Sequence, residues 1–484
     1  MNSLQNIKTN LRLNISIIVG ILISICFIPL ILLPTLRGPN VQIFVAFFLL
    51  ASFFYGISVF RIERDTVPII AIWVIAISGR LLWLLTSPSL SDDVFRYIWD
   101  GHLMNLGQNP FAEPVNSGLL DAFTISIRSL VNNDWMASPY LPSAQVYFAM
   151  VTRLAPKRAT AFQIGALILD LGVAWMIMRM LPKVSIASNA VLIYLWNPLV
   201  MIEFSHGAHV DALMIFLMVL ALFCILQSEL NPQKMSGYLW GSVIAMAAAT
   251  LTKGLPLLLV PLFLRKWRWK RLLVYLLLIF SGCAAFAVGA GWGIMGPING
   301  KGVFGAFRIY ASYWQYNAGL YKILETIIDF LFGGHSGGEI ASSAARLFSG
   351  CITGTAAGWA GWKVWQGKHT ARFPGSLFFF RLALLPIGVY LLFAPTVHPW
   401  YLTIVFPFLP FFVKTKDEQV PHSFIILPWI WFGALISLSY LSYTDIENFH
   451  EYSFVSWVEY LPFYALLIWS VLKISNNRNK ISFV

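Results

Sequence analysis

The sequence predicts an all-α fold, a polytopic membrane bundle of roughly 12–14 transmembrane helices. Composition is the first reason, because 58% of the 484 residues are hydrophobic and only 11% are charged, whereas soluble domains carry about 25% charged residues. The second reason is that the apolar residues gather in runs of about 20, the length that a helix needs to cross a bilayer. This composition excludes a soluble globular protein.

Candidate spans follow one another along the whole chain. Lys8 and Arg12 precede the first apolar run, which is too long for the core of a signal peptide and lacks a small-residue cleavage site, so we expect it to stay as a span. Two runs, 255–264 and 401–413, are short enough to fit broken or re-entrant helices. The candidate spans are 13–36, 41–60, 67–86, 160–181, 186–204, 210–227, 237–251, 255–264, 272–292, 341–362, 376–395, 401–413, 423–440 and 455–472.

The distribution of charge orients the predicted bundle. If the N-terminus is cytoplasmic, the cytoplasmic connections hold most of the basic residues, including the runs 61–64 and 265–271 and the C-terminal tail. The acidic residues gather on the other face, chiefly in 87–142. Since cytoplasmic loops are enriched in Lys and Arg, we expect both termini in the cytoplasm and the active face outside, as in a bacterial plasma membrane. The net charge of +12 is then a topology signal and does not indicate nucleic-acid binding.

One basic cluster opposes this topology. Arg153, Lys157 and Arg158 fall on the outer side. Two interpretations stay open: the segment 140–154 dips into or across the membrane, or the cluster meets acidic lipid head groups.

Two long outer loops are predicted, 87–142 and 293–340. The first is acidic and rich in Trp, Asn, Pro and Gly, and we expect short helices in it that lie along the membrane surface. The second carries Arg308 and the aromatic run 310–319. The sequence shows no internal repeat and no low-complexity segment, so we expect a single membrane domain, 1–484.

The strongest chemical signal is a pair of adjacent carboxylates, Asp92 and Asp93, at the start of the first outer loop. On a helix that begins there, Asp93, Arg96 and Asp100 recur at i, i+3 and i+7, and Asp92 reaches Arg96 at i+4. A solvated helix that pairs its own charges would explain the pattern without any function. The position directly after a membrane span, in a chain with few charges, favours a functional site instead.

Several segments resemble the GT-C membrane glycosyltransferases. The nearest resemblance is to the prokaryotic polyprenyl-phosphate-mannose-dependent mannosyltransferases, and it covers most of 91–407. Position 140 departs from the Tyr-Pro-Pro-Leu pattern of the family, with Pro139-Tyr140-Leu141-Pro142 in its place. The segments that carry the resemblance are 92–110 (DDVFRYIWDGHLMNLGQNP), 138–145 (SPYLPSAQ), 197–213 (NPLVMIEFSHGAHVDAL), 253–261 (KGLPLLLVP), 314–320 (WQYNAGL) and 398–401 (HPWY).

The resemblance implies an inverting glycosyltransferase that moves a sugar, mannose by the nearest branch, from a polyprenyl-phosphate donor to a hydroxyl of a glycan or glycolipid at the outer face. The loop 87–142 would then be the catalytic loop. A sugar hydroxyl is a poor nucleophile, so a carboxylate must take its proton. In the family an aspartate of the first loop does this, and either Asp93 or Asp92 stands at that position.

The departing phosphate monoester is anionic and requires cations. We predict Arg96, Lys253 and Arg308 as its ligands. Lys253 stands beside Gly254 and Pro256, where a helix is expected to break. A lysine in such a place either extends to the membrane surface or meets an anion.

Further residues are predicted to bind substrate. In the segment 203–211, His206 and His209 together with Asp211 or Glu203 could bind a divalent ion, but a donor with one phosphate does not require one, so we predict no cofactor and do not favour a metal. The aromatic residues of the later segments either stack on sugars or belong to the interfacial aromatic belt. The predicted substrate-binding residues are Trp99, Asp100, Asn105, Asn109, His206, His209, Asp211, Trp314, Gln315, Asn317, His398, Trp400 and Tyr401.

Two other functions stay open. A transporter or flippase of a lipid-linked saccharide would also have many spans with intramembrane charges such as Asp170, Arg346 and Arg381. That class predicts internal repeats and paired interrupted helices, which the sequence does not show. A membrane scaffold without activity would make the acidic loop incidental.

Overall fold

The computed structural model describes residues 15–294, 299–332, 337–367, 375–415, 422–445 and 450–482. These residues form helices and their connections, and their only β-type pairing is one isolated bridge between Tyr316 and Thr396. The prediction of an all-α fold is therefore confirmed.

Most of the bundle consists of helices that run along its length. They are α2 (Ile15–Ile31), α3 (Val41–Phe60), α4 (Ile69–Trp83), α7 (Ala159–Met180), α10 (Asp211–Leu230), α11 (Met235–Thr250), α12 (Val260–Ala287), α15 (Gly337–Gln366), α16 (Gly375–Phe393), α17 (Ile426–Leu435) and α18 (Ser453–Ser482).

Shorter helices connect them. The short α-helices are α5 (Asp93–Asn105), α6 (Pro142–Leu154), α8 (Leu192–Leu195), α9 (Pro198–Ser205), α13 (Gly305–Tyr313) and α14 (Leu320–Leu331). The 3₁₀ helices are η1 (Gly38–Asn40), η2 (Gly118–Phe123), η3 (Arg128–Leu130), η4 (Leu181–Val184), η5 (Ser188–Val191), η6 (Pro232–Lys234), η7 (Leu255–Leu259), η8 (Pro399–Val405), η9 (Leu409–Phe412), η10 (Ser423–Ile425) and η11 (Ile436–Tyr443).

Within the described residues, 7 helical stretches are long and apolar enough to cross a membrane. Two shorter apolar helices, α2 and α4, add to them. This is an integral membrane protein, and its described residues hold fewer stretches of this kind than the roughly 12–14 spans that the sequence predicts. The stretches are Gly38–Phe60, Ala159–Val184, Asp211–Leu230, Leu255–Ala287, Ser376–Phe393, Ser423–Tyr443 and Ser453–Asn477.

Proline explains where predicted spans fail. The predicted span 186–204 divides into η5, α8 and α9, because α9 starts anew at Pro198, a residue that suits a first helical position. Asn197 caps this new helix, its Oδ1 accepting from the N–H of Val200 at 3.0 Å. The predicted span 401–413 becomes η8 and η9, in a segment where proline removes backbone donors. The predicted run 255–264 is no separate span, since η7 leads directly into α12.

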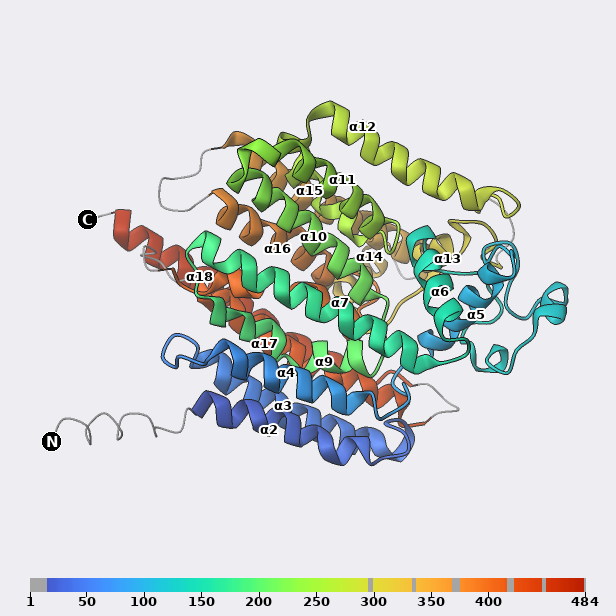
Figure 1. The fold of residues 1–484 in the computed structure, drawn as a ribbon, viewed down its shortest axis with the longest axis horizontal. Helices are drawn as coiled ribbons and strands as arrows, with labels where there is room; N and C mark the ends of the chain where they lie inside the picture. Colours follow the sequence, from blue (N-terminus) through green and yellow to red (C-terminus); the bar gives the residue numbers. More distant parts are fainter. Residues whose placement is uncertain are drawn as a thin grey trace.

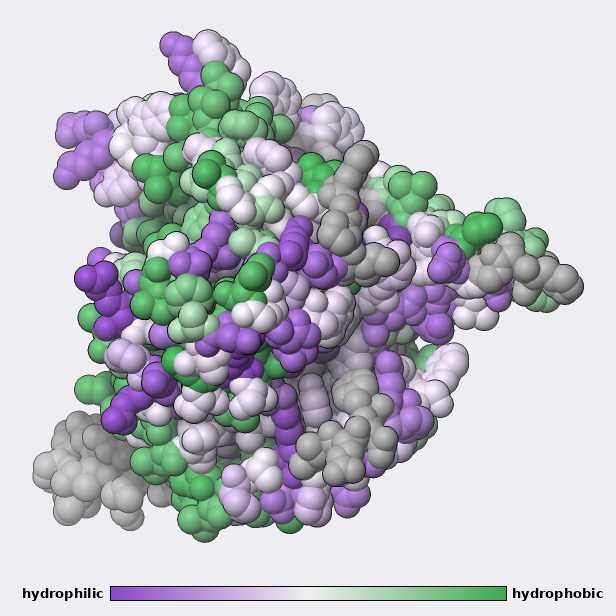
Figure 2. Space-filling model, turned by 90° about the vertical axis from the view of Figure 1, so that its right-hand side faces the viewer, coloured by the Kyte–Doolittle hydropathy of each residue, from purple (hydrophilic) through white to green (hydrophobic). Residues whose placement is uncertain are grey.

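The two ends of the bundle differ (Figure 1). At one end α2 begins and α18 ends, while α5, α6 and α13 lie together at the other end. The segment 140–154, whose place was left open, forms α6, which has 13 residues and is too short to cross a bilayer. Figure 2 looks onto this second end, where hydrophilic residues cluster over the middle of the face.

Charges inside the bundle are held by protein partners. Arg80 of α4 pairs with Asp170 of α7 at 2.5 Å, and both side chains are fully buried. Tyr194 donates to the other oxygen of Asp170 at 2.6 Å. Arg346 donates to the carbonyls of residues 311 and 314, and Arg381 to that of residue 411. Since buried charges are tolerated when paired and hydrogen-bonded, packing explains these residues without a transport pathway.

Candidate functional site

The candidate site lies at the end of the bundle where α5 begins. A non-helical link leads from the end of α4 to Asp93, the first residue of α5, and Asp92 occupies the N-cap position. The backbone N–H of Asp93 donates to Ser91 Oγ at 3.2 Å. Because the helix dipole stabilises a negative charge in the first turn, the local fold favours an ionised Asp93.

Groups from distant parts of the chain surround Asp93. Asn132 Nδ2 donates to Asp93 Oδ1 at 3.1 Å. His209 Nδ1 lies 3.8 Å from Asp93 Oδ2. The Asp93 side chain keeps 17% of its surface exposed, so the protein does not enclose it completely.

The electrostatic setting keeps Asp93 ionised. Burial alone would raise the pKa of Asp93, but the positive charges of His209 and Lys253 and hydrogen bonds from Asn132 and Tyr140 lower this pKa below its ordinary value. At neutral pH the group is therefore a carboxylate that can accept a proton.

Asp92 has a different environment from its neighbour. Its Oδ2 accepts from Arg37 at 2.9 Å, and its side chain is 36% exposed. The Arg37 guanidinium also lies over the ring of Tyr443, 4.7 Å from the centroid. The two adjacent carboxylates thus separate, Asp92 toward Arg37 and Asp93 toward His209.

His206 belongs to the support of the site. Its Nδ1 lies 2.9 Å from Thr86 Oγ1, and its Nε2 accepts from the N–H of Ser89 at 3.1 Å. The residue is 1% exposed, and burial lowers the pKa of His206 to about 3. As a neutral, enclosed ring it anchors the link between α4 and α5, and it has no open face for the sugar contact that was predicted.

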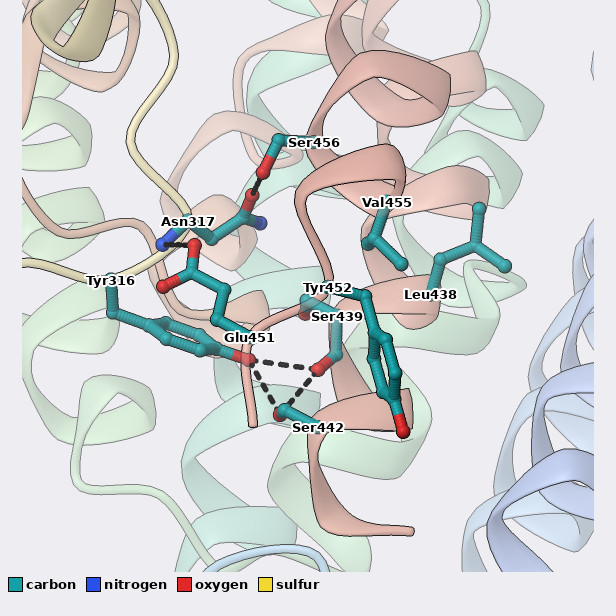
Figure 3. Close-up of a pocket in the computed structure, with 9 residues that line it drawn as sticks. All are labelled: Tyr316, Asn317, Leu438, Ser439, Ser442, Glu451, Tyr452, Val455 and Ser456. Atoms are coloured by element: carbon teal, nitrogen blue, oxygen red, sulfur yellow. Dashed lines mark hydrogen bonds between the residues drawn. The ribbon is translucent and has the colours of Figure 1, made fainter. Parts of the chain in front are cut away.

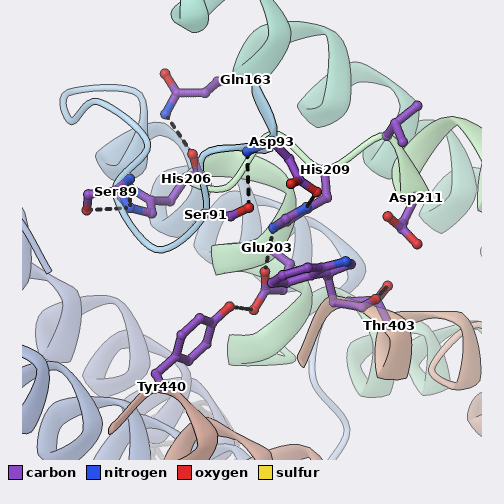
Figure 4. A network of polar contacts seen from close by, with 12 residues as sticks. Ser89, Ser91, Asp93, Gln163, Glu203, His206, His209, Asp211, Thr403 and Tyr440 are labelled. Carbon is purple, nitrogen blue, oxygen red and sulfur yellow. Dashed lines mark hydrogen bonds and ion pairs between the residues drawn. The ribbon is translucent and has the colours of Figure 1, made fainter. Parts of the chain in front are cut away.

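His209 is fully buried between two carboxylates (Figure 4). Opposite Asp93, its Nε2 lies 3.2 Å from Glu203 Oε2. The other oxygen of Glu203 accepts from Tyr440 at 2.6 Å. The chain of contacts from Asp93 through His209 and Glu203 to Tyr440 leads from the exposed carboxylate into the interior of the bundle.

A column of stacked rings stands beside this chain. Trp400 stacks on His209 with centroids 4.2 Å apart and on His398 with centroids 4.4 Å apart. Tyr316 covers the other face of His398 at 4.6 Å. Burial lowers the pKa of His398 to about 3, so its ring is neutral. Trp400 and His398 therefore each stack on two rings of the protein, and the predicted stacking on sugar stays a prediction.

Lys253, a predicted phosphate ligand, lies near Asp93 and pairs with Asp211. Its Nζ donates to Asp211 Oδ2 at 2.6 Å and lies 5.1 Å from the centroid of the Tyr401 ring. The Lys253 side chain is 22% exposed and that of Asp211 is 3% exposed. Asp211 therefore lies beneath an ammonium group that still reaches the open side.

Arg96 and Asp100 turn inward. Arg96 donates to the carbonyl of Met136 at 2.8 Å, and its Nε lies 3.3 Å from Asp100 Oδ1. Ser138 donates to Asp100 Oδ2 at 2.5 Å and receives a bond from Gln145 at 2.6 Å. Burial raises the pKa of Asp100 and Arg96 partly offsets this effect. Both side chains are 2% exposed, so they join α5 to the segment 136–145 and lie out of reach of a ligand.

Three other predicted residues of the first loop brace it. Trp99 is 1% exposed, and the guanidinium of Arg128 covers its ring at 5.5 Å. Asn105 donates to the carbonyl of residue 149 in α6 at 3.0 Å. Asn109 donates to the carbonyl of Phe286 in α12 at 2.6 Å. These contacts fix the position of α5.

The helix α13 approaches Asp93 from the second loop. Burial and the charge of Asp93 raise the pKa of Tyr310, and a hydrogen bond with Tyr401 lowers it. Tyr310 of α13 therefore lies near both residues. Arg308, a predicted phosphate ligand, is half-buried on the same helix. Trp314 stacks on Tyr310 with centroids 4.8 Å apart.

The next residues of the second loop are locked into the fold. Gln315 donates to Glu325 at 2.7 Å, and Asn317, in the left-handed region at φ 46, donates to Glu459 at 2.6 Å. Asn317 also lines a cavity of about 10 Å³ (Figure 3), room for about one water. These contacts join the second loop to its neighbours, and the sugar contacts predicted for Gln315 and Asn317 stay predictions.

Several residues near Asp93 were not predicted. Asn132 and Arg37 carry no sequence signal, because each becomes a neighbour only through folding. Glu203 appeared only as a possible metal ligand, although an acidic residue in an apolar run is a signal of its own. In the part of the chain that the structure describes, no group of three or more His, Cys, Asp or Glu side chains is arranged to hold a metal ion.

Comparison with known proteins points to one family. Residues 31–269 match the family model described as Alpha-(1->6)-mannopyranosyltransferase, N-terminal domain. The matched stretch includes Asp93, Glu203, His209 and Lys253. No curated protein and no solved structure matches the chain.

Proposed function

Because residues 31–269 match the alpha-(1->6)-mannopyranosyltransferase family model, we propose that the protein is a membrane mannosyltransferase, that its donor is a polyprenyl-phosphate mannose and that Asp93 is the base which activates the acceptor. The observation that carries this proposal is the Asp93 carboxylate itself. It is partly open, ionised, and held by Asn132 at the polar end of a membrane bundle.

The proposed step is a single displacement. The acceptor hydroxyl oxygen attacks the anomeric carbon of mannose, its proton passes to an Asp93 carboxylate oxygen, and the bond from carbon to the phosphate oxygen breaks with its electron pair leaving on the phosphate. Attack from the face opposite the phosphate inverts the anomeric centre. An α product, which the family name specifies, then requires a β-linked donor.

The phosphate is proposed to lie against Lys253. The Lys253 side chain is partly exposed. Burial raises the pKa of Asp93, and the charges of His209 and Lys253 lower it, so Lys253 lies close to that carboxyl group. Asp211 accepts one of its hydrogen bonds, and two N–H donors remain for a phosphate. Arg308 on α13 is the second proposed cation. Arg96, enclosed with Asp100, is dropped from this role.

The acceptor is proposed to be a glycan or glycolipid that presents a primary hydroxyl, because a 1→6 linkage joins the new sugar to such a group. Several side chains that were predicted for sugar contact support the site from behind, as Trp99, Asp100 and His206 do. We therefore place the sugars on the open side of Asp93, Lys253 and Tyr401.

The test is a transfer assay with protein reconstituted in lipid vesicles. Radiolabelled polyprenyl-phosphate mannose is offered beside GDP-mannose, each with a mannose-terminated acceptor. We expect label in the acceptor from the lipid-linked donor and a new α1→6 linkage in the product. Transfer from GDP-mannose alone would overturn the proposed donor.

A further inference from the structure

His209 stands between two carboxylates that come from different helices. Asp93 opens α5, and Glu203 lies in α9. The distances are 3.8 Å from Nδ1 to Asp93 Oδ2 and 3.2 Å from Nε2 to Glu203 Oε2. Figure 4 shows the imidazole spanning the gap. His209 is 0% and Glu203 1% exposed, so both side chains are shielded from bulk solvent.

The fold determines the direction of the ring. Trp400 lies flat against it at an interplanar angle of 15°. A Cβ at Gly207 would come within 2.7 Å of the imidazole, so the loop approaches it more closely than any larger residue would allow. Ala208 adopts the left-handed region at φ 57, a backbone conformation that is unfavourable for alanine. The chain thus accepts local strain to aim one ring nitrogen at each carboxylate.

Both ring nitrogens and Glu203 Oε2 are buried without a well-formed hydrogen bond. Buried polar atoms in this condition are rare and often belong to functional sites, where contacts tighten when the substrate binds. A doubly protonated imidazole can donate to both carboxylates at once, whereas a neutral ring would turn a lone pair toward one of them. The arrangement therefore fits a positive ring between two negative groups.

We propose that His209, backed by Glu203, is a positioning residue for Asp93: its imidazolium orients the Asp93 carboxylate and keeps it ionised until the acceptor hydroxyl arrives. This inference rests on the proposed role of Asp93 as the base. Glu203 acts one step further back, because its carboxylate lies against the far nitrogen of the ring, and Tyr440 holds Glu203 in place.

The other titratable groups near the His209 ring are either paired or neutral. Asp211 follows His209 by two residues, but Lys253 pairs with it at 2.6 Å. His206 and His398 also act electrostatically near the ring. Burial lowers the pKa of each to about 3, so both stay neutral at the pH of an assay.

The test is the pH dependence of kcat/KM, whose acid limb reports the base of the free enzyme. Glu203→Gln keeps the shape and the bond from Tyr440 but removes the charge. With less support for the protonated ring, Asp93 loses its neighbouring cation and holds a proton more readily. We expect the acid limb to move to higher pH, by about one pH unit, the lower end of what an opposite charge at this distance produces.

His209→Gln should shift the limb in the same direction, and the double variant should shift it no further than the larger single effect, because the two residues act through one contact. His206→Asn is the matched control, a histidine of equal burial three residues earlier. It is expected to reduce stability or overall rate while the limb stays at the wild-type pH. If His209→Gln does not fold, the shift of the acid limb in Glu203→Gln alone tests the positioning role.

An unmoved acid limb in folded Glu203→Gln would overturn the positioning role. Asp93→Asn, assayed beside it, separates this failure from that of the proposed function. An inactive Asp93→Asn with an unmoved limb in Glu203→Gln leaves Asp93 as the base and removes only the role of His209. An active Asp93→Asn removes the base, and the inference falls with it.

Discussion

Two neighbouring aspartates carry different environments at the start of α5. Asp92 is held by Arg37, a cation from the connection after α2, and is more than a third exposed. Asp93 faces His209 and Asn132 and is mostly enclosed. The two side chains are identical in the sequence, and only their partners in the fold separate the ion pair of Asp92 from the proposed base Asp93.

Asp93→Asn is expected to abolish transfer, with kcat/KM falling on the order of 10²–10⁴, because the amide cannot take the acceptor proton. The measurement is initial velocity in vesicles, with folding checked by thermal denaturation. Asp92→Asn is the matched control. Its partly exposed ion pair contributes about 1 kcal/mol or less, so its rate should fall by less than about fivefold. A larger loss in Asp92→Asn than in Asp93→Asn would exchange the two roles.

Lys253→Gln is expected to raise the donor KM by on the order of tenfold and to leave acceptor binding nearly unchanged, since the ammonium is assigned to the donor phosphate. Because this change leaves Asp211 buried and unpaired, the double variant Lys253→Gln with Asp211→Asn is measured as well. It should recover stability but not donor binding. Recovery of donor affinity in the double variant would show that Lys253 serves the fold alone.

Arg96→Gln gives the contrasting result among the predicted phosphate ligands. It leaves the buried carboxylate of Asp100 without its cation, so we expect a loss of stability of about 3–5 kcal/mol, with donor KM unchanged in the protein that still folds. Thermal denaturation and a donor titration check the two parts. A raised donor KM with normal stability would return Arg96 to the phosphate site.

At the scale of elements, α5 takes its place from α6. Tyr97 stacks on Phe148 of α6 with centroids 4.5 Å apart. The helices approach most closely at Gly101, where a Cβ would collide with the carbonyl of Phe148 and lie 2.5 Å from Thr152 Oγ1. The buried network of Asp100, Ser138 and Gln145 ties the same helix to the loop that precedes α6. The position of Asp93 is therefore set by helix packing two turns away.

Gly101→Ala is expected to push α5 away from α6 and displace Asp93. A misplacement of about 1 Å can cost about 10²-fold in rate, so kcat should fall by roughly 10- to 100-fold while the protein stays in the membrane. Gly118→Ala is the matched control in the same loop, since its Cβ would meet only Asp121, in ordinary contact at 3.8 Å. Equal activity of both variants would mean that α5 tolerates the shift.

At the scale of the whole molecule, the bundle separates the two kinds of charge. The acidic loop that contains Asp93 stands at one end, and α2 begins and α18 ends at the other (Figure 1). Since basic residues mark cytoplasmic connections, we propose that the Asp93 end faces the exterior or periplasm. There a lipid-linked donor can present its phosphate and sugar at the membrane surface.

This orientation predicts the labelling of introduced cysteines. In a Cys351→Ser background, which removes the exposed native thiol, a membrane-impermeant thiol reagent should label Asn116→Cys in intact cells. Glu63→Cys, in the connection between α3 and α4, is the control and should react only after permeabilisation. The reverse pattern would place the site in the cytoplasm, with nucleotide-activated sugars.

Local patterns were enough to single out Asp93 and Lys253 as candidates. Asp93 begins a helix directly after a span, and Lys253 follows the end of α11 beside Gly254, so both could be recognised from short stretches of sequence. The aromatic and histidine residues were recognised as a group, but local sequence could not show which neighbours they pack against. Whether His398 faces a sugar or stacks on Trp400 depends on segments that are far apart in the chain.

The sequence by itself determined the membrane class, the helical fold and the carboxylate pair, because composition and local periodicity are properties of neighbouring residues. Only the tertiary structure decided which aspartate is enclosed and that Arg96 is buried in an ion pair with Asp100. It also decided that His209 lies between Asp93 and Glu203. The physical reason is that burial and electrostatic partnership depend on contacts between helices, and no single stretch of the chain contains them.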